Sequence, residues 1–272
     1  MKIVPDFTYA SPNDPAVKRG IIRGIERLAG KKKILRLYKS IPQEMAGHPG
    51  FFFEAIKVLK VDLDWDKEQL AKIPKDGPVI FIANHPFGVL DGIIMCNLAA
   101  TNREKWGIMI NEALCKVDHL KENLLPINFD ETKEAVKLNI ESKKKAMKML
   151  KAGGSLIIFP AGGISTADRK GFGEVTDLEW KLFTAKLIQM TRATVVPVFF
   201  HGRNSRIFQI VSQFSLTLRL SMVIRELRRQ IGKTQKVTIG DPIFYDQMEV
   251  IKGRQALLDY LREKTYALET RH

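Results

Sequence analysis

Three short apolar runs, separated by longer amphipathic stretches, constrain the fold of this chain more than any other feature. They are PVIFIAN at 78–84, SLIIFP at 155–160 and TVVPVFF at 194–200. Each is rich in Val, Ile and Phe and bounded by turn residues, which is typical of strands buried on both faces. Strands that alternate with helices predict an α/β fold with a largely parallel central sheet, whose ligand sites gather beyond the carboxyl ends of the strands.

Helical periodicity fills the segments between and after these runs. A helix is predicted at 131–152, with Asp130 as its N-cap and Gly153 as its stop signal. The other predicted elements are a helix at 177–191, a strand at 236–244 and a C-terminal helix at 250–267. We therefore expect residues 73–272 to form one α/β domain flanked by helices.

Residues 1–72 are predicted to form a basic helical arm. Residues 1–15 contain three prolines and no periodicity, after which apolar residues recur at helical spacing on either side of Gly30. From Lys18 to Lys39, nine Lys and Arg residues oppose one acid, Glu26, and give +8 of the formal net charge of +14. The two apolar sets, each indicating a short amphipathic helix, are Ile21, Ile25 and Leu28, then Ile34, Tyr38 and Ile41.

Two interpretations of this arm stay open from the sequence. Its helices could pack one face on the core as ordinary surface helices. They could instead dock on an anionic membrane surface, because the charge density exceeds what solubility requires. The same choice applies to Phe51, Phe52 and Phe53, which favour a place in the core over a membrane-facing wedge.

The net charge and a pI near 9.7 indicate a polyanionic partner: nucleic acid, an anionic lipid surface, or an acidic carrier or cofactor. Nucleic-acid binding is disfavoured, because the arm has no exposed aromatics interleaved with its basic residues beyond Tyr38. The two cysteines lack metal-ligand spacing, so no metal is expected. Without a signal peptide or an apolar run of ~20 residues, the predicted location is the cytoplasm, peripheral on the inner face of the cell membrane.

The stretch NHPFGVLDG at 84–92 follows the first predicted strand. His85 stands where α/β folds place reactive groups, and Gly88 allows a tight turn that brings Asp91 to the imidazole. A carboxylate on one ring nitrogen orients a histidine and raises its basicity, so that the other nitrogen can take a proton from a hydroxyl near neutral pH. The cluster predicts a catalytic His85–Asp91 pair, with Asn84 and Gly88 as binding residues beside it.

Two further loops are predicted to end at the same edge of the sheet. In FFHGRNSRIF at 199–208, Arg203 or Arg206 could clamp an anion, and a plain surface position is the equal alternative. In FPAGGIS at 159–165, consecutive glycines leave backbone N–H groups free for an oxyanion or a phosphate. The candidate binding residues of this loop are Phe159, Pro160, Ala161, Gly162, Gly163 and Ser165.

In this order, NHPFGVLDG, FPAGGIS and VVPVFFHG resemble the sequential blocks of the glycerolipid acyltransferase superfamily, the PlsC-like lysophospholipid acyltransferases. The chain is most similar to the subgroup labelled hemolysin-like, which includes lyso-ornithine-lipid acyltransferases. The resemblance extends from Val79 to about Pro242. The arm stretch IERLAGKKKILRLY is also similar to the N-terminal region of that subgroup.

The resemblance implies transfer of a fatty acyl group from an acyl-CoA or acyl carrier protein thioester to the hydroxyl of a lysolipid or lipid-like acceptor. No covalent enzyme intermediate and no cofactor beyond the thioester co-substrate are implied. His85 matches the catalytic base and Asp91 the aspartate that orients it. FPAGGIS matches the block that holds the head group of the acceptor, and Pro197 matches the proline of the last block.

Two departures from the family pattern affect these expectations. Five residues separate His85 from Asp91 where four are usual, so the turn must accommodate one more, at Gly88. The third block, normally FPEGTRS, has lost its Glu, Thr and Arg, and the second, represented by LLPINFD, has no arginine either. Without a guanidinium for a phosphate, we expect the acceptor to have an amino-acid or other phosphate-free head group, with lyso-ornithine lipid as the leading example. The residues that replace Glu, Thr and Arg are Ala161, Gly163 and Ile164.

The residues and the resemblance predict the same mechanism. Nε2 of His85 would take the proton of the acceptor hydroxyl, and backbone N–H groups near Gly162 and Gly163 would stabilise the oxyanion formed at the thioester. The basic arm would hold the enzyme on anionic lipid, at ~1 kcal/mol per basic residue. A thioesterase or lipid hydrolase with the same pair is the main alternative, although the chain lacks the G-x-S-x-G elbow that often accompanies one.

Overall fold

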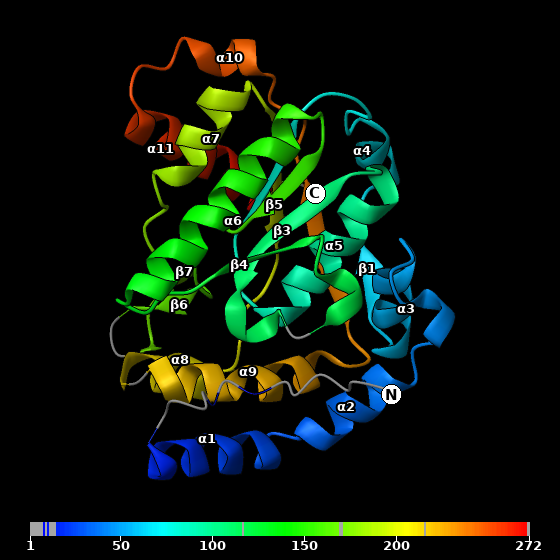
Figure 1. Cartoon of the computed structure of the whole chain (residues 1–272), viewed down its shortest axis with the longest axis vertical. Coiled ribbons are helices and arrows are strands. Elements are labelled where there is room, and N and C mark those ends of the chain that lie inside the picture. Colours follow the sequence, from blue (N-terminus) through cyan, green and yellow to red (C-terminus); the bar gives the residue numbers. More distant parts are fainter. Residues whose placement is uncertain are drawn as a thin grey trace.

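A computed structural model describes residues 8, 10, 15–115, 117–168, 171–214 and 216–270, and within them seven strands form one sheet (Figure 1). The spatial order is β1-β9-β8-β2-β5-β3-β4. The strands are β1 (Asp62–Asp64), β2 (Val79–Ala83), β3 (Trp106–Asn111), β4 (Leu124–Ile127), β5 (Ser155–Ile158), β8 (Thr194–Phe200) and β9 (Thr234–Ile239). A separate antiparallel pair joins β6 (Thr166–Ala167) to β7 (Val175–Thr176). Most of residues 1–15, predicted to be irregular, lie outside the described residues.

The strand directions confirm the predicted α/β fold with a largely parallel sheet. From β8 through β2, β5 and β3 to β4 every neighbour is parallel, whereas β9 pairs with β8 antiparallel and β1 follows β9. The sequence reading had no strand at β3, β4 or β1. The edge strand β4 is only partly buried and contains Pro126, which a strand tolerates at an edge but which weakens its sequence signal.

Helices cover both faces of the sheet (Figure 1). They are α1 (Ala16–Leu28), α2 (Lys31–Lys39), α3 (Phe51–Val58), α4 (Lys67–Ala71), α5 (Val89–Asn102), α6 (Lys133–Lys151), α7 (Phe183–Thr191), α8 (Arg206–Phe214), α9 (Leu216–Gln230), α10 (Tyr245–Glu249) and α11 (Arg254–Tyr266). Short 3-10 turns lie at Gln43–Met45, Glu112–Leu114, Asp118–Leu120 and Ala267–Thr270.

The fully buried strand β2 divides the interior into two cores, because alternate side chains of a strand point to opposite faces. Val79, Phe81 and Ala83 pack with α3, α5 and part of α9. Ile80 and Ile82 pack with α6, α7 and α11. The strand β2, which ends two residues before His85, is therefore packed on both faces and makes a rigid base for that residue.

Three predicted helix starts were wrong. The C-terminal helix, predicted from residue 250, begins at Arg254. Thr132, not Asp130, caps α6, because its Oγ1 accepts the N–H of Ala135 at 3.1 Å. The helix predicted from Asp177 begins at Phe183, because the Asp177 side chain is part of a buried hydrogen-bond network instead. Capping by a short polar side chain is possible at several neighbouring positions, so the sequence alone could not choose among them.

Both predicted helices of the arm are present, and they lie along α8 and α9 at one end of the molecule (Figure 1). In α2, the predicted apolar set packs on the core through Ile34. In α1, however, the predicted set faces outward: Ile21 is 53% and Leu28 84% exposed, while Ile22 and Glu26 are the buried residues. The two halves of the arm thus use their apolar faces differently.

The three phenylalanines that open α3 also divide between core and surface. Phe51 and Phe52 are buried in the core, as expected, whereas Phe53 is 58% exposed. Within the described part of the chain, no helix is both long and apolar enough to cross a bilayer.

Candidate active site

The site begins where β2 ends, at Asn84. The Asn84 amide donates to the carbonyl of Phe200 at 3.0 Å and accepts the Phe200 N–H at 2.8 Å. This buried side chain therefore extends the pairing of β2 with β8 by one residue and fixes the direction in which the chain leaves the strand. Its predicted part in substrate binding remains a prediction.

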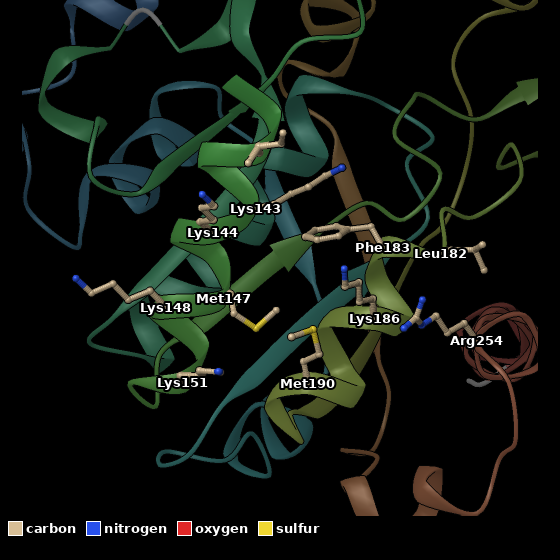
Figure 2. A pocket seen from close by; sticks show the side chains of 11 residues that line it. Lys143, Lys144, Met147, Lys148, Lys151, Leu182, Phe183, Lys186, Met190 and Arg254 are labelled. Atoms are coloured by element: carbon tan, nitrogen blue, oxygen red, sulfur yellow. The ribbon is translucent and has the colours of Figure 1, made fainter. Parts of the chain in front are cut away.

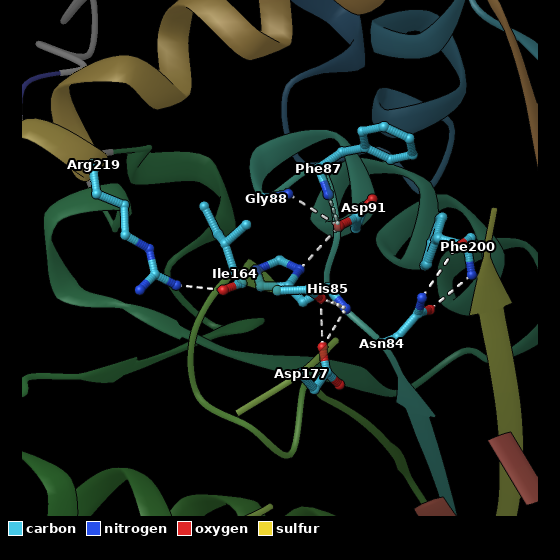
Figure 3. Close-up of polar contacts among 10 residues, drawn as sticks. Asn84, His85, Phe87, Gly88, Asp91, Ile164, Asp177, Phe200 and Arg219 are labelled. Atoms are coloured by element: carbon cyan, nitrogen blue, oxygen red, sulfur yellow. Dashed lines mark hydrogen bonds and ion pairs between the residues drawn. The ribbon is translucent and has the colours of Figure 1, made fainter. Parts of the chain in front are cut away.

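His85 and Asp91 lie together, as the motif predicted (Figure 3). Nδ1 of His85 is 3.1 Å from Oδ2 of Asp91, and the His85 side chain is 17% exposed while that of Asp91 is fully buried. The ring nitrogen does not point straight at the oxygen, which is common in catalytic pairs before substrate binds. The Phe159 ring stacks on the imidazole, with centroids 3.8 Å apart, and limits its rotation.

The turn between the two residues holds the Asp91 carboxylate. Oδ2 accepts the backbone N–H of Phe87 at 2.9 Å and of Gly88 at 3.0 Å. Asp91 also stands in the first turn of α5, where a helix favours negative charge. Burial raises the pKa of Asp91, while His85 and the two N–H groups oppose that rise. The charged form of this carboxyl group therefore depends on its immediate partners.

The turn between His85 and Asp91 depends on Gly88. Its backbone has φ 78° and ψ −115°, a conformation that is readily adopted by glycine alone. A Cβ at Gly88 would also lie 2.7 Å from Cδ1 of Ile164, in the loop after β5. Gly88 and Ile164, the two positions at which the sequence was expected to depart from the acyltransferase blocks that it resembles, are therefore close neighbours.

The backbone of His85 is tied to the same loop. Its N–H points to both Ser165 Oγ and Asp177 Oδ1, each at 3.2 Å, and its carbonyl accepts the Ser165 N–H at 2.8 Å. The Ser165 hydroxyl donates to Asp177 Oδ1 at 2.5 Å. Three segments of the chain thus fix the position of the histidine.

A second layer of contacts holds Asp177 in turn. The Trp180 Nε1–H donates to Oδ2 at 3.0 Å, and the Asp177 N–H donates to the hydroxyl of Tyr266 at 2.8 Å. Burial raises the pKa of Asp177, and the Ser165 and Trp180 hydrogen bonds oppose that rise. Burial, with Asp177 nearby, raises the pKa of Tyr266 to about 12. Sequence reasoning missed this network, whose only signal was an aspartate and a tryptophan three positions apart.

The FPAGGIS loop passes beside the imidazole, as predicted. Pro160 and Ala161 are buried, and the carbonyl of Pro160 accepts the N–H of Lys181 at 2.9 Å. The N–H of Gly162 is already used in a turn, since it donates to the carbonyl of Phe159 at 2.9 Å. Among the described residues, the N–H of Gly163 has no partner.

Arg219, from α9, is a cation that contacts this loop (Figure 3). Its Nη2 donates to the carbonyl of Ile164, and it would be 3.4 Å from a Cβ placed on Gly163. The arginines proposed from the sequence stand elsewhere: Arg206 is exposed and reaches the carbonyls of residues 171 and 172, and Arg203 is also exposed. Their part in anion binding remains a prediction, and nothing in the sequence singled out Arg219.

Within the described residues, no group of three or more His, Cys, Asp or Glu is placed to hold a metal ion. The site itself consists of a histidine oriented by a buried carboxylate, beside a glycine loop and one guanidinium. This arrangement suits proton abstraction from a hydroxyl and stabilisation of an oxyanion.

Comparisons with known proteins identify the family of this chain. Residues 23–271 match a protein-family model described as "Acyltransferase". A "Lyso-glycine lipid O-acyltransferase" of Bacteroides thetaiotaomicron is 30% identical over 220 residues, which cover 76% of this chain and 76% of that protein. A protein of the same name from Phocaeicola vulgatus is 29% identical over 211 residues, covering 73% of this chain and 71% of the relative.

The fold is also similar to a solved structure. The 1-acyl-sn-glycerophosphate (LPA) acyltransferase PlsC from Thermotoga maritima matches with a TM-score of 0.54 and 18% identity. The match covers 93% of this chain and 95% of that one. It supports the sheet order and layers described above.

Proposed function

The chain belongs to the acyltransferase family, and on that premise we propose that it moves a fatty acyl group from a thioester to the hydroxyl of a lysolipid. The observation that supports this most is the His85–Asp91 pair, 3.1 Å apart at the end of a rigid buried strand. Such a pair offers a positioned base to a hydroxyl. Acyl-CoA and acyl carrier protein remain the two candidate donors.

In the proposed mechanism, Nε2 of His85 takes the proton of the acceptor hydroxyl while Asp91 stabilises the imidazolium. The alkoxide attacks the thioester carbonyl to give a tetrahedral oxyanion. The unpaired N–H of Gly163 is the donor we assign to that oxyanion, in place of the Gly162 N–H, which is engaged in a turn. Collapse of the intermediate breaks the C–S bond, and the thiolate recovers the proton from His85.

The acceptor is proposed to carry an amino-acid head group. The loss of the usual arginine from the third block argues against a phosphate, and the relatives are named for a lyso-glycine lipid. The lyso-ornithine-lipid acyltransferases that the sequence resembles share this kind of head group. Glycine therefore replaces ornithine as the first head group to try.

The enzyme is proposed to work on an anionic membrane surface, held there by α1 and α2. Val17 and Leu28 are 76% and 84% exposed, and with Ile21 they lie on one side of α1 at helical spacing. Apolar side chains of this kind enter the head-group region while neighbouring Lys and Arg residues meet anionic lipid. The exposed stripe favours docking over the alternative in which α1 simply packs on the core.

An acyl-transfer assay tests the proposal. The purified protein is incubated with a labelled long-chain acyl thioester and vesicles that contain lyso-glycine lipid, lyso-ornithine lipid or lysophosphatidate, followed by lipid chromatography. We expect a labelled diacyl product, formed faster with the amino-acid lipids than with lysophosphatidate. Release of free fatty acid without any lipid product would instead identify a hydrolase and overturn the proposal.

A further inference from the structure

Arg219 is a partly buried cation, and among the described residues no carboxylate lies within ion-pair distance of it. Within the same residues, its one hydrogen-bond partner is the carbonyl of Ile164. Burial lowers the pKa of Arg219, which means that the surroundings do not offset the cost of removing its charge from water. A guanidinium has five N–H donors, so most of its hydrogen-bonding capacity remains available to a ligand.

The Arg219 guanidinium lies beside the loop that contacts the catalytic histidine. It borders Gly163 and Ile164, the loop that also holds Ser165 against the backbone of His85. The third block of the family normally supplies its own arginine here, and this chain has Ile164 instead. Arg219 therefore brings a guanidinium to the loop from a different element, α9.

We propose that Arg219 binds the free carboxylate of the acceptor's head group and so selects the acceptor. The inference rests on the proposed function and adds a binding site to it. A guanidinium matches a carboxylate with two parallel N–H···O hydrogen bonds, which give both affinity and orientation. A single cation also balances the single charge of a carboxylate better than the charge of −1.5 to −2 that a phosphate monoester carries near pH 7.

The proposal fixes how the head group is joined to its lipid. Glycine has no hydroxyl, so an O-acyltransferase for a lysolipid of glycine must use a hydroxyl on the acyl chain already attached. Attachment through the glycine nitrogen leaves a carboxylate free, whereas attachment through the carboxyl group leaves an ammonium. Only the first suits Arg219, so we expect an N-(hydroxyacyl) amino acid as the acceptor.

The test compares an N-(hydroxyacyl)glycine with its methyl ester, which has the same chain and hydroxyl but no charge. For the unaltered protein we expect kcat/KM to favour the acid by about ten- to hundredfold, as for a lost charge-assisted hydrogen bond. Arg219→Gln should remove this preference by slowing the acid alone, and Arg219→Lys should keep part of it. Arg229→Gln, an exposed change on the same helix, is the matched control and should keep the full preference.

The methyl ester distinguishes an error in the proposed carboxylate site from an error in the proposed function. If Arg219→Gln slows acid and ester equally, or if the preference for the acid survives, the carboxylate site is wrong while acyl transfer stands. If lysophosphatidate is the better acceptor and loses its advantage in Arg219→Gln, the residue binds phosphate and the proposal is also wrong. Failure of the unaltered protein to acylate any of the acceptors would count against the proposed function itself.

A second, independent feature is a basic groove between α6 and α7, with Arg254 of α11 at its edge (Figure 2). The groove has a volume of about 760 Å³, and Met147 and Met190 point toward each other on its floor. No acidic residue lines it, and among the described residues none of its cations forms an ion pair. The cations are Lys143, Lys144, Lys148, Lys151, Lys186 and Arg254.

We further propose that this groove docks an acidic acyl carrier protein, which delivers the thioester; this too rests on the proposed function. Lys144, Lys148 and Lys151 follow one another along α6 at spacings of four and three residues, which forms a row about 10 Å long. A row of cations spread over three helices, above an apolar floor, complements the acidic side of a protein helix.

Donor kinetics test this docking surface. The triple variant Lys144→Glu, Lys148→Glu and Lys151→Glu should raise KM for an acyl carrier protein thioester at least tenfold, and leave KM for the matching acyl-CoA unchanged. The control is the triple change of Lys133, Lys137 and Lys145 to Glu, on the same helix outside the groove, which should affect neither donor. An equal effect on both donors, an equal effect of the control triple, or use of CoA alone would overturn the docking proposal. A protein inactive with either donor would overturn the proposed function.

Discussion

The two ends of the proposed acceptor site are built in different ways. At the hydroxyl end, His85 and Asp91 come from a single turn after β2, and backbone N–H groups of that turn hold the buried carboxylate. At the head-group end, the loop after β5 meets Arg219, which reaches it from α9. The first end is fixed by backbone geometry, and the second depends on one side chain.

This difference separates chemistry from selection. A change at the hydroxyl end should slow transfer to every acceptor, because each acceptor needs the same base. A change at the head-group end should alter which acceptor is used, because only some acceptors carry the anion that Arg219 would bind. Four further predictions test or refine this separation, beginning with the largest effect.

Removing the base is the strongest test. We expect His85→Ala to lower kcat/KM by about 10²- to 10⁴-fold for all acceptors alike, the usual contribution of a general base. His48→Ala, an exposed histidine in the arm, is the matched control and should retain activity. If the His85→Ala protein acylates acceptors with either head group at the unaltered rate, His85 is not the base.

Asp91→Asn tests whether the buried charge of Asp91 speeds the reaction while lowering the stability of the fold. Burial raises the pKa of Asp91 above that in the unfolded chain. Such a group adds stability only at low pH, and that contribution is lost as pH rises through the folded-state pKa. At neutral pH the buried charge therefore costs stability, and a neutral Asn removes this cost.

We expect Asp91→Asn to lower kcat by roughly ten- to a thousandfold for both kinds of head group, since the imidazolium loses its partner. Its Tm at neutral pH should equal or exceed that of the unaltered protein, and this advantage should shrink as pH is lowered. Activity assays and thermal melts across pH measure both effects. A large drop in Tm at neutral pH would show that the carboxylate is mainly structural.

The arm provides a third test. If it holds the enzyme on the membrane, changes in it should affect all membrane-bound acceptors alike. Lys31 lies 3.5 Å from the buried carboxylate of Glu26, so it should stay unchanged. At ~1 kcal/mol per basic residue, changing Arg27, Lys32 and Lys33 to Gln should weaken sedimentation with anionic vesicles by up to about a hundredfold. Added salt should weaken it further. Equal binding to neutral vesicles would contradict this role.

The smallest effect concerns the contacts behind the histidine. Ser165→Ala removes the hydroxyl that joins the His85 backbone to Asp177, so we expect kcat to fall by up to about tenfold with little change in KM. Ser155→Ala, which also removes a buried hydroxyl hydrogen bond, is the control. Both should cost ~0.5–1.5 kcal/mol of stability, but only the first should lower kcat. A change in acceptor preference in Ser165→Ala would contradict the separation of chemistry from acceptor selection.

The same contrast explains how far the sequence could be interpreted. The strands β2, β5 and β8 were predicted because they are buried on both faces and consist of continuous apolar residues. The contact of His85 with Asp91 was predicted because both belong to one turn, where spacing determines proximity. The strands β3 and β4 were not predicted: β3 includes Gly107 and ends at Asn111, and the edge strand β4 contains Pro126, so neither is a run of continuous β-branched and aromatic residues.

Arg219 and Asp177 could not be found in this way. Their neighbours in the site are distant in sequence, and an arginine in a helix or an aspartate before one has many ordinary explanations. The sequence left the environment of the apolar side of α1 open for a related reason: a periodic apolar set predicts a helix with an apolar face but does not say what covers that face. Only the packing of α1 against α9 reveals it.

The close approach of Gly88 to Ile164 predicts that these two positions changed together during evolution. Each position departs from the family pattern, and in the folded chain any side chain at Gly88 would occupy the space that Ile164 fills. The longer turn and the lost arginine should therefore have been inherited together. An alignment of acyltransferases should show the turn length and the arginine covarying. A chimera that restores the shorter turn without the arginine, or the arginine without the shorter turn, should fold worse than the two proteins from which it is made.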